Sequence, residues 1–410
     1  MPTGFYLLIA AQFLSALADN ALLIVTMAVL QAHDSPAWWA PLLKFGFTLA
    51  YVVLAPVMGD LADAFPKARL MAWMNGVKWL GACALMLSVH PVLAFCLVGL
   101  GAAGYAPAKY GLITELVPPR RLVAANGWIE VSVVTAALVG TGLGGWLVST
   151  HWLDSGLAAQ VQMGLQALSL DADALMASLL AVIMLYVMSG LLNLGVPDSG
   201  ARYPASSIHP RALVLAFWRA NRTLWRDPEG GLSLAVTTLF WGVAATLQFI
   251  VLRWAEERLS LSLSQAAYLQ AAVAVGVVCG AMLAARFVPL AQARRVMLAG
   301  VVLGLMMPVA ASVQSVPLAV VLLIWTGVLG GLMVVPLNAL LQHRGHVLLT
   351  AGRSVAVQGF NENASILVML SLYAGLLAAQ VSIIDLMWGF GLLIAVVMCA
   401  LMRAVKAPAA

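Results

Sequence analysis

LSALADNALLIVT, residues Leu14–Thr26, places Asp19 and Asn20 side by side near the middle of an apolar run. The run extends from about residue 5 to residue 30, and ~20 apolar residues suffice for a helix to cross the hydrocarbon core of a bilayer. A carboxylate at that depth costs roughly 2.5–3.5 kcal/mol on insertion scales, so this helix needs a polar partner or a water-filled cavity. We therefore expect the other membrane helices to be arranged around that requirement.

The composition indicates an integral membrane protein. Of the 410 residues, 63% are hydrophobic and 9% are charged, and the mean hydropathy is +0.99, whereas a soluble globular chain is typically about 25% charged. The net charge of +5 does not point to nucleic acid, because the basic residues lie between apolar runs and not on one clustered face. The four cysteines lie within apolar runs without CxxC spacing, so we expect no disulfide framework, no metal site and no cofactor.

Twelve apolar segments predict an all-α membrane protein with twelve transmembrane helices. The segments cover residues 5–31, 38–62, 68–89, 91–113, 121–149, 175–196, 231–254, 264–288, 293–312, 316–342, 350–379 and 382–403. The first segment is expected to be retained, because residues 1–3 lack the positive start and cleavage site of a signal peptide. Lys and Arg are concentrated in alternate connections, which predicts that both termini are cytoplasmic.

An internal repeat divides the chain into two halves. LGAAGYAPAKYGLITE (100–115) aligns without a gap with LGGLMVVPLNALLQHR (329–344), at an offset of 229 residues that carries Asp19 onto Gln248. We expect six-helix bundles at 1–196 and 231–410, joined by a cytoplasmic linker, 197–230, whose stretch 209–226 has the periodicity of an amphipathic interfacial helix. Parallel six-helix halves related by a pseudo-two-fold axis, with the site between them, are the architecture of the major facilitator superfamily.

The connection between the second and third segments resembles the signature of that superfamily. It contains the residues that we expect to form a cytoplasmic gate: Gly59, Asp60, Asp63, Lys67 and Arg69. Asp63 is suited to cap the N-terminus of the helix 350–379, where the helix dipole would stabilise its charge. The alternative is a solvated acidic turn without a gating role.

Polar residues within the apolar segments form the candidate site. Those expected to bind substrate are Asp19, Asn20, Lys109, Gln248, Asn338, Glu362 and Asn363, and those expected to support them are Asn75, Lys78, Asn126 and Glu130. Both signs of charge occur, which suits a ligand that carries an anion and a cation. Alternatively, Lys78 and Glu130 neutralise each other or another buried charge.

Two pairs of glycines are spaced for close helix packing. Gly140 and Gly144, like Gly276 and Gly280, form small-xxx-small faces, which are more typical of helix contacts than of chemistry.

Seven motifs spread over both halves resemble the bacterial lysophospholipid transporter (LplT) family. They are AQFLSALADNALL (11–23), NGVKWLG (75–81), GAAGYAPAKYG (101–111), VAANG (123–127), LFWG (239–242), VPLNALLQ (335–342) and AVQGFNENA (356–364). The resemblance implies a flippase-like transporter that moves lysophosphatidylethanolamine and related lysophospholipids from the outer to the inner leaflet of the bacterial inner membrane.

The same resemblance implies roles for residues and partners. Asp19, Asn20, Lys109 and Glu362 match functional polar positions of the family, whereas Gln248 stands where members can carry an arginine. The transported lipid would be reacylated by an acyltransferase/acyl-carrier-protein synthetase. Membrane lipids are the other expected partners, and we expect a monomer.

Two other functions are alternatives for this sequence. A proton-coupled drug or metabolite antiporter of the same superfamily would use Asp19 and Glu362 as proton carriers. A membrane-embedded acyl-transfer enzyme is disfavoured because none of the six histidines begins an HxxxxD motif and there is no GxSxG elbow. A phosphate-binding loop is also missing from the sequence, so we expect neither an enzyme nor an ATP-driven pump.

Overall fold

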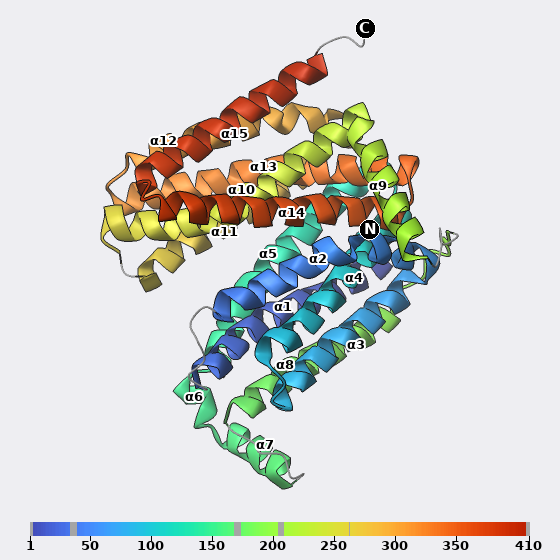
Figure 1. Ribbon diagram of the computed structural model, residues 1–410, viewed down its shortest axis with the longest axis vertical. Coiled ribbons are helices and arrows are strands. Elements are labelled where there is room, and N and C mark those ends of the chain that lie inside the picture. Colours follow the sequence, from blue (N-terminus) through green and yellow to red (C-terminus); the bar gives the residue numbers. More distant parts are fainter. Residues whose placement is uncertain (1–2, 33–38, 168–173, 204–208, 262, 407–410) are drawn as a thin grey trace. The chain divides into compact units, whose positions relative to one another are not determined.

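The computed structural model describes residues 3–32, 39–167, 174–203, 209–261 and 263–406, and within these ranges it contains helices and no strand. Fifteen α-helices and two short 3₁₀ helices follow one another (Figure 1). Their bounds are α1 Thr3–Ala32, α2 Trp39–Ala64, α3 Lys67–Met86, α4 Pro91–Leu116, η1 Pro119–Arg121, α5 Leu122–Leu147, α6 Thr150–Leu153, α7 Gly156–Ala167, α8 Ala174–Leu194, α9 Pro210–Arg226, α10 Pro228–Leu259, α11 Leu263–Phe287, η2 Leu290–Val296, α12 Met297–Ala311, α13 Val316–Leu348, α14 Ala351–Ala378 and α15 Ile383–Lys406.

All twelve predicted segments coincide with helices, and eleven helical segments of the described chain are long and apolar enough to cross a membrane. The segment that is not among the eleven is α3, whose 20 residues include Lys67, Arg69, Asn75 and Lys78. Large apolar side chains such as Val53 and Leu93 are exposed on the helices, as expected for surfaces that face lipid. The prediction of an all-α, multi-pass membrane protein is confirmed.

Two features of the helices were not anticipated. The stretch after α5 contains the short helices α6 and α7, where the apolar pattern predicted only a loop. In addition, α10 begins three residues before its apolar run, because the Asp227 side chain accepts a hydrogen bond from the Gly230 backbone N–H (2.7 Å) and Pro228 occupies the first turn. Capping therefore extends the helix beyond the run that hydropathy identifies.

The chain forms two compact units. Unit 1 contains Met1–Leu116 and Thr135–Val214, and unit 2 contains Val117–Val134 and Leu215–Ala410. The boundaries fall within α5 and α9, so each of these helices contributes residues to both units. The division into bundles at 1–196 and 231–410 stays a prediction.

Unit 1 is built on the packing of α3 and α4, of α2 against α4, and of α8 against both α1 and α3. Its apolar core includes Leu22 of α1, Phe95 of α4 and Tyr186 of α8, all almost inaccessible to solvent. Gly140 and Gly144 of α5 approach α1 closely, because a Cβ at either position would lie within 3 Å of an α1 carbonyl oxygen. The expected small-residue contact is therefore confirmed.

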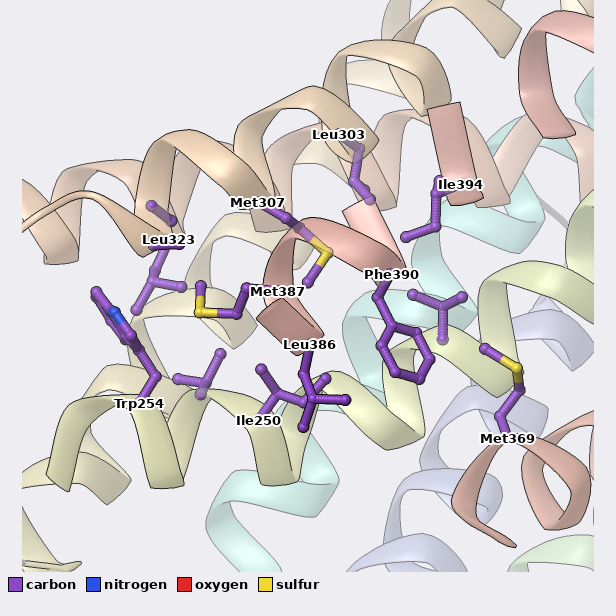
Figure 2. Close-up of a cluster of buried hydrophobic side chains, with 14 of the residues drawn as sticks. Ile250, Trp254, Leu303, Met307, Leu323, Met369, Leu386, Met387, Phe390 and Ile394 are labelled. Carbon is purple, nitrogen blue, oxygen red and sulfur yellow. The ribbon is translucent and has the colours of Figure 1, made fainter. Parts of the chain in front are cut away.

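The core of unit 2 is apolar and rich in methionine (Figure 2). Ile250 and Trp254 of α10 pack with residues of α12 and α15, among them Met307, Met387 and Phe390. Leu323 of α13 and Met369 of α14 belong to the same cluster, to which α11 also contributes Ala266 and Leu269. Dispersion contacts of this kind are individually weak, but together they hold the helices in a unique arrangement.

A seam of glycines joins α11 to α13 in unit 2. Gly276 and Gly280 of α11 face α13, and Gly327 and Gly331 of α13 face α11. A Cβ at Gly280 would lie 2.1 Å from the carbonyl oxygen of Val328, a distance that no packed structure allows. The second predicted small-residue face is thus also a helix contact, and it permits backbone-to-backbone packing.

Gly280→Ala should destabilise the protein, because the new methyl group must separate α11 from α13. Overpacking of this type costs about 1–3 kcal/mol, and thermal unfolding in detergent would detect it as a lower midpoint. Gly375→Ala is the matched control, since no atom lies within 4 Å of a Cβ at that position of α14. Equal midpoints for the two variants would contradict the assigned role of the seam.

Candidate functional site

A buried ion pair joins α1 to α3 inside unit 1. Lys78 Nζ lies 2.7 Å from Asp19 Oδ2, and the side chains are 2% and 19% exposed, respectively. The Tyr186 hydroxyl donates a hydrogen bond of 2.9 Å to Asp19 Oδ1, so both carboxylate oxygens are bound. The prediction that Lys78 neutralises a buried charge is confirmed, but its partner is Asp19 and not Glu130.

A chain of hydrogen bonds continues from this ion pair. Lys78 Nζ also donates to Ser15 Oγ (2.9 Å), and Ser15 donates to Asn75 Oδ1 (2.8 Å). Asn75 Nδ2 in turn donates to Ser189 Oγ (2.8 Å), which bonds to the carbonyl oxygen of Ala11 (2.7 Å). The network therefore connects α1, α3 and α8.

Helical spacing places these polar side chains on common faces. Ser15 and Asp19 are four residues apart on α1, while Asn75 and Lys78 are three apart on α3, and both spacings bring side chains together on one side of a helix. Tyr186 and Ser189 repeat the pattern on α8. The sequence analysis missed Ser15, Tyr186 and Ser189, although Ser15 could have been found from its spacing to Asp19.

Two further predicted site residues of unit 1, Lys109 and Asn20, make other contacts. Lys109 Nζ of α4 lies 3.2 Å from Gln12 Oε1 and 4.2 Å from the ring centroid of Tyr110. Asn20 Nδ2 donates to the carbonyl oxygen of Ala16 within α1 (2.8 Å). Their predicted contact with substrate stays a prediction.

In unit 2, a glutamine of α14 binds two of the predicted residues. Gln358 Nε2 donates to Asn338 Oδ1 of α13 (3.0 Å) and to Glu362 Oε1 (2.8 Å). Asn363 Nδ2 bonds instead to the carbonyl oxygen of Gly359 on its own helix (2.8 Å). Gln358 was missed by the sequence analysis, although it lies four residues before Glu362 on the same helical face.

The remaining polar residues of unit 2 form separate pairs. Asn126 of α5 and Gln342 of α13 exchange two amide hydrogen bonds of 2.9 Å each. Gln248 is exposed, and its amide bonds to Gln270 of α11 at 3.3 Å. Glu130 is buried on α5. Gln248 thus joins α10 to α11 and, among the described residues, hydrogen-bonds to neither Asn338 nor Glu362.

The turn between α2 and α3 is buried and ion-paired. Lys67 Nζ lies 2.7 Å from Glu115 Oε1, with side chains 0% and 4% exposed, while Asp60 and Asp63 are also buried. Gly59 is buried as well, and Arg69 is exposed. The alternative of a solvated acidic turn is therefore wrong, although the gating role itself stays a prediction.

The segment that follows α8 covers this turn. Ser199 Oγ donates to Glu115, the Tyr203 backbone N–H donates to the carbonyl oxygen of Asp63 (3.2 Å), and Lys67 Nζ lies 5.4 Å from the Tyr203 ring centroid. Glu115 was not among the predicted residues, because a glutamate at the end of an apolar run is ordinarily a solvated one. Capping of α14 by Asp63 stays a prediction.

A second charged cluster lies where α10 begins. Asp227 accepts two hydrogen bonds from the guanidinium of Arg344 at the end of α13, one of them 3.0 Å from Nε. Glu229 pairs with Arg294. The pKa of Asp227 is held below its usual value, chiefly by the Arg344 hydrogen bonds and also by the Gly230 backbone N–H, against an opposing effect of burial.

The sequence as a whole is similar to those of known transporters. The profile of the Major Facilitator Superfamily matches residues 8–361. The lysophospholipid transporter LplT of Yersinia pestis (strain Pestoides F) is 41% identical over 367 residues, covering 89% of this chain and 85% of that protein. The protein of the same name from Yersinia pseudotuberculosis serotype I (strain IP32953) has the same identity and coverage.

Solved structures share the fold at much lower identity. A bacterial homologue of the iron transporter ferroportin, in its outward-facing state, is similar over 99% of this chain and all of that chain, with a TM-score of 0.71 and 14% identity. The transporter FucP in the outward conformation matches over 99% of each chain, with a TM-score of 0.70 and 16% identity. Identities this low support the fold alone.

The Lys67–Glu115 pair should show strong coupling in a double-mutant cycle. Lys67→Met or Glu115→Gln alone leaves a buried charge without its partner, which costs about 3–5 kcal/mol. Lys67→Met combined with Glu115→Gln removes both charges, and the stability of this double variant in detergent should recover most of that loss. Additive effects of the two single changes would show that the pair is not coupled.

The Asp227–Arg344 pair should make stability depend on pH. Because the pKa of Asp227 is lowered in the folded state, its contribution is fully present above the unfolded pKa of about 3.9 and is lost as the pH falls through the folded value. The difference in unfolding temperature between wild type and Arg344→Gln should therefore be large at pH 6 and shrink below pH 4. Arg344 also lies 3.6 Å from Glu229 Oε2, so the control background is Asp227→Asn/Glu229→Gln. In that background the same comparison should show little pH dependence, and a difference that persists there would contradict the assignment.

Proposed function

The chain belongs to the major facilitator superfamily and to the family of the lysophospholipid transporter LplT, and from this membership we propose that it moves lysophospholipids across the bacterial inner membrane. The proposed substrates are lysophosphatidylethanolamine and related lipids, carried from the outer to the inner leaflet. The observation that supports a zwitterionic substrate is the Asp19–Lys78 pair, which places both signs of charge at one buried position.

The energetics of the lipid favour a path that separates head from tail. Drawing a sixteen-carbon tail through water would cost on the order of 12 kcal/mol, at ~0.8 kcal/mol per methylene. A charged headgroup in hydrocarbon is also strongly disfavoured. We infer that the head crosses through the polar interior of the protein by alternating access, while the acyl tail stays in lipid.

The headgroup is proposed to bind by exchanging partners with the ion pair. Lys78 already forms an ion pair with Asp19. A free cation could therefore bind Asp19 only by leaving the buried charge of Lys78 without a partner. A zwitterion avoids this cost, because its ammonium replaces Lys78 at Asp19 while its phosphate accepts from Lys78. No net charge enters, and transport of a neutral headgroup need not respond to the membrane potential.

Glu362 is proposed as a second acceptor for the ammonium group. Glu362 accepts a hydrogen bond from the neutral amide of Gln358, and among the described residues of unit 2 no lysine or arginine forms an ion pair with it. The remaining candidates, Asn20, Lys109, Gln248, Asn338 and Asn363, are proposed donors toward the phosphate or glycerol. The same property of Glu362 would suit the proton carrier of an antiporter, which the experiment below distinguishes.

The cellular setting belongs to the same proposal. We place the protein in the inner membrane with both termini in the cytoplasm, acting as a monomer without an enzymatic step of its own. Reacylation of the delivered lipid is assigned to a separate acyltransferase/acyl-carrier-protein synthetase. Gly59, Asp60, Asp63, Lys67 and Arg69 are proposed to close the cytoplasmic side, with Glu115 fixing Lys67.

Uptake of radiolabelled lysophosphatidylethanolamine into proteoliposomes tests the proposal. Asp19→Asn and Lys78→Gln should each lower uptake about 10- to 100-fold, as expected for the loss of a charge-assisted hydrogen bond worth ~1.5–3 kcal/mol. The exposed pair Arg253 and Glu257 of α10 provides a control, since Arg253→Gln/Glu257→Gln should transport normally.

The double variant Asp19→Asn/Lys78→Gln separates transport from folding. It leaves neither Asp19 nor Lys78 as an unpaired charge, so its stability should approach that of the wild type while its uptake stays low. Normal uptake by this variant would overturn the assigned binding residues. Uptake that requires a pH gradient, together with export of drugs, would favour the antiporter.

A further inference from the structure

The helix α9 is attached to unit 2 by one of its faces. Phe217, Ala220, Asn221 and Leu224 are buried, and the Phe217 ring lies edge-on to Phe360 of α14, with centroids 5.2 Å apart. The amphipathic pattern of the sequence predicted this apolar face but assigned it to the membrane interface. Instead, the face packs on protein, so contact with lipid must involve other residues of α9.

A polar contact fixes α9 beside the candidate site helix. Asn361 Nδ2 of α14 donates to Asn221 Oδ1 (2.9 Å), and Trp225 Nε1 donates to Asn361 Oδ1 (3.1 Å). Both polar atoms of the Asn361 side chain thus bind α9. The next residue of α14 is Glu362. Movement of α9 is therefore transmitted directly to α14, the helix that carries Glu362.

The opposite face of α9 is basic and exposed. Its exposed arginines are Arg211, Arg219, Arg222 and Arg226, and α9 contains no acidic residue. The two acids that follow it, Asp227 and Glu229, are paired with Arg344 and Arg294. None of the four arginines forms an ion pair within the described residues of the chain.

Large apolar side chains accompany the arginines. Val214, Leu215, Trp218 and Trp225 are 44%, 57%, 50% and 41% exposed. Arginine next to tryptophan is the composition of helices that lie in the headgroup region of a membrane. An acidic protein partner would account for the arginines but not for these exposed apolar side chains.

The direction of α9 agrees with such a location. Figure 1 shows α9 running crosswise to α10 and α14, which are long and apolar enough to span the membrane. A helix perpendicular to spanning helices lies parallel to the bilayer plane. Because α10 starts at Pro228, directly after α9, α9 lies at the level where the chain enters the membrane.

We propose that the arginine face of α9 binds the phosphate groups of anionic phospholipids in the leaflet beside it, and that the contact among Asn221, Trp225 and Asn361 couples this binding to α14. The partner is a lipid surface and not the transported lipid. The proposal is therefore independent of which substrate the protein carries.

Lipid selectivity of the full-length protein in nanodiscs tests the binding. Spin-labelled phosphatidylglycerol should associate with the protein more strongly than spin-labelled phosphatidylcholine, by about fivefold for each arginine at the headgroups, the equivalent of ~1 kcal/mol per residue. R211Q/R219Q/R222Q/R226Q should remove this preference, and the corresponding lysine variant should keep it. R286Q/R403Q, which changes exposed arginines of α11 and α15, is the matched control.

Two outcomes would overturn the proposal: a preference that survives in the glutamine variant, or one that falls equally in the control. If the fourfold variant does not fold, the lipid preference of R211Q/R219Q and the salt dependence of the wild type still test the binding. Binding through phosphate charges must weaken severalfold between low salt and 0.5 M salt, and a preference that does not change with salt would exclude it.

Hydrogen–deuterium exchange tests the coupling. Phosphatidylglycerol should slow amide exchange in residues 356–364 of the wild type, because a bound α9 holds Asn361 in place. W225F keeps an aromatic side chain but removes the Nε1 donor, so this effect should be reduced at least severalfold, whereas W218F should behave like the wild type. Identical exchange with and without phosphatidylglycerol would show that α9 is not coupled to α14.

Discussion

The pairing of Asp19 with Lys78 inside an apolar bundle is the constraint on which unit 1 depends. Either charge alone would carry a desolvation penalty of several kcal/mol, so α1 and α3 must be held in the rotation that brings the two together. Ser15, Asn75 and Ser189 extend the contact to α8. Several rotations of these helices about their axes would bury a similar apolar area, whereas only one rotation forms the polar network.

In unit 2, different side chains occupy the positions that correspond to the buried ion pair of unit 1. At the offset of the internal repeat, Asp19 corresponds to Gln248, and Lys78 corresponds to Met307 in the apolar core (Figure 2). The ends of the two repeats also differ in sign, since Glu115 pairs with Lys67 while its equivalent Arg344 pairs with Asp227. The two halves therefore share a backbone plan, but the buried positive charge that neutralises Asp19 has no counterpart in the second.

The sequence predicts the membrane helices well and the contacts of their polar residues less well. Runs of apolar residues located the spanning helices, because bilayer thickness sets a minimum length for each run. The sequence identified Asp19 and Lys78 as charges with a high free energy of burial. Their pairing depends on the rotation of α1 and α3 about their axes, and hydropathy does not encode that rotation. The sequence did not single out Glu115, Gln358 and Tyr186. Glutamate near a helix end, glutamine and tyrosine often lie at the protein surface, so their presence does not by itself indicate a buried contact. The helices α6 and α7 lie in a stretch too polar for a transmembrane pattern.

The polar contacts of α9 have a consequence for the helices around the candidate site. α9 continues into Asp227, which caps α10 and binds Arg344 of α13, while Asn361 of α14 binds both Asn221 and Trp225. Three helices of unit 2 are thus attached to α9 or to the residue that follows it. The neutral hydrogen bonds of Asn361 contribute ~0.5–1.5 kcal/mol each, and those of Asp227 with Arg344 ~1.5–3 kcal/mol each, so displacing α9 alone is unfavourable. The helices that carry Asn338 and Glu362 must therefore move together with α9, as one body.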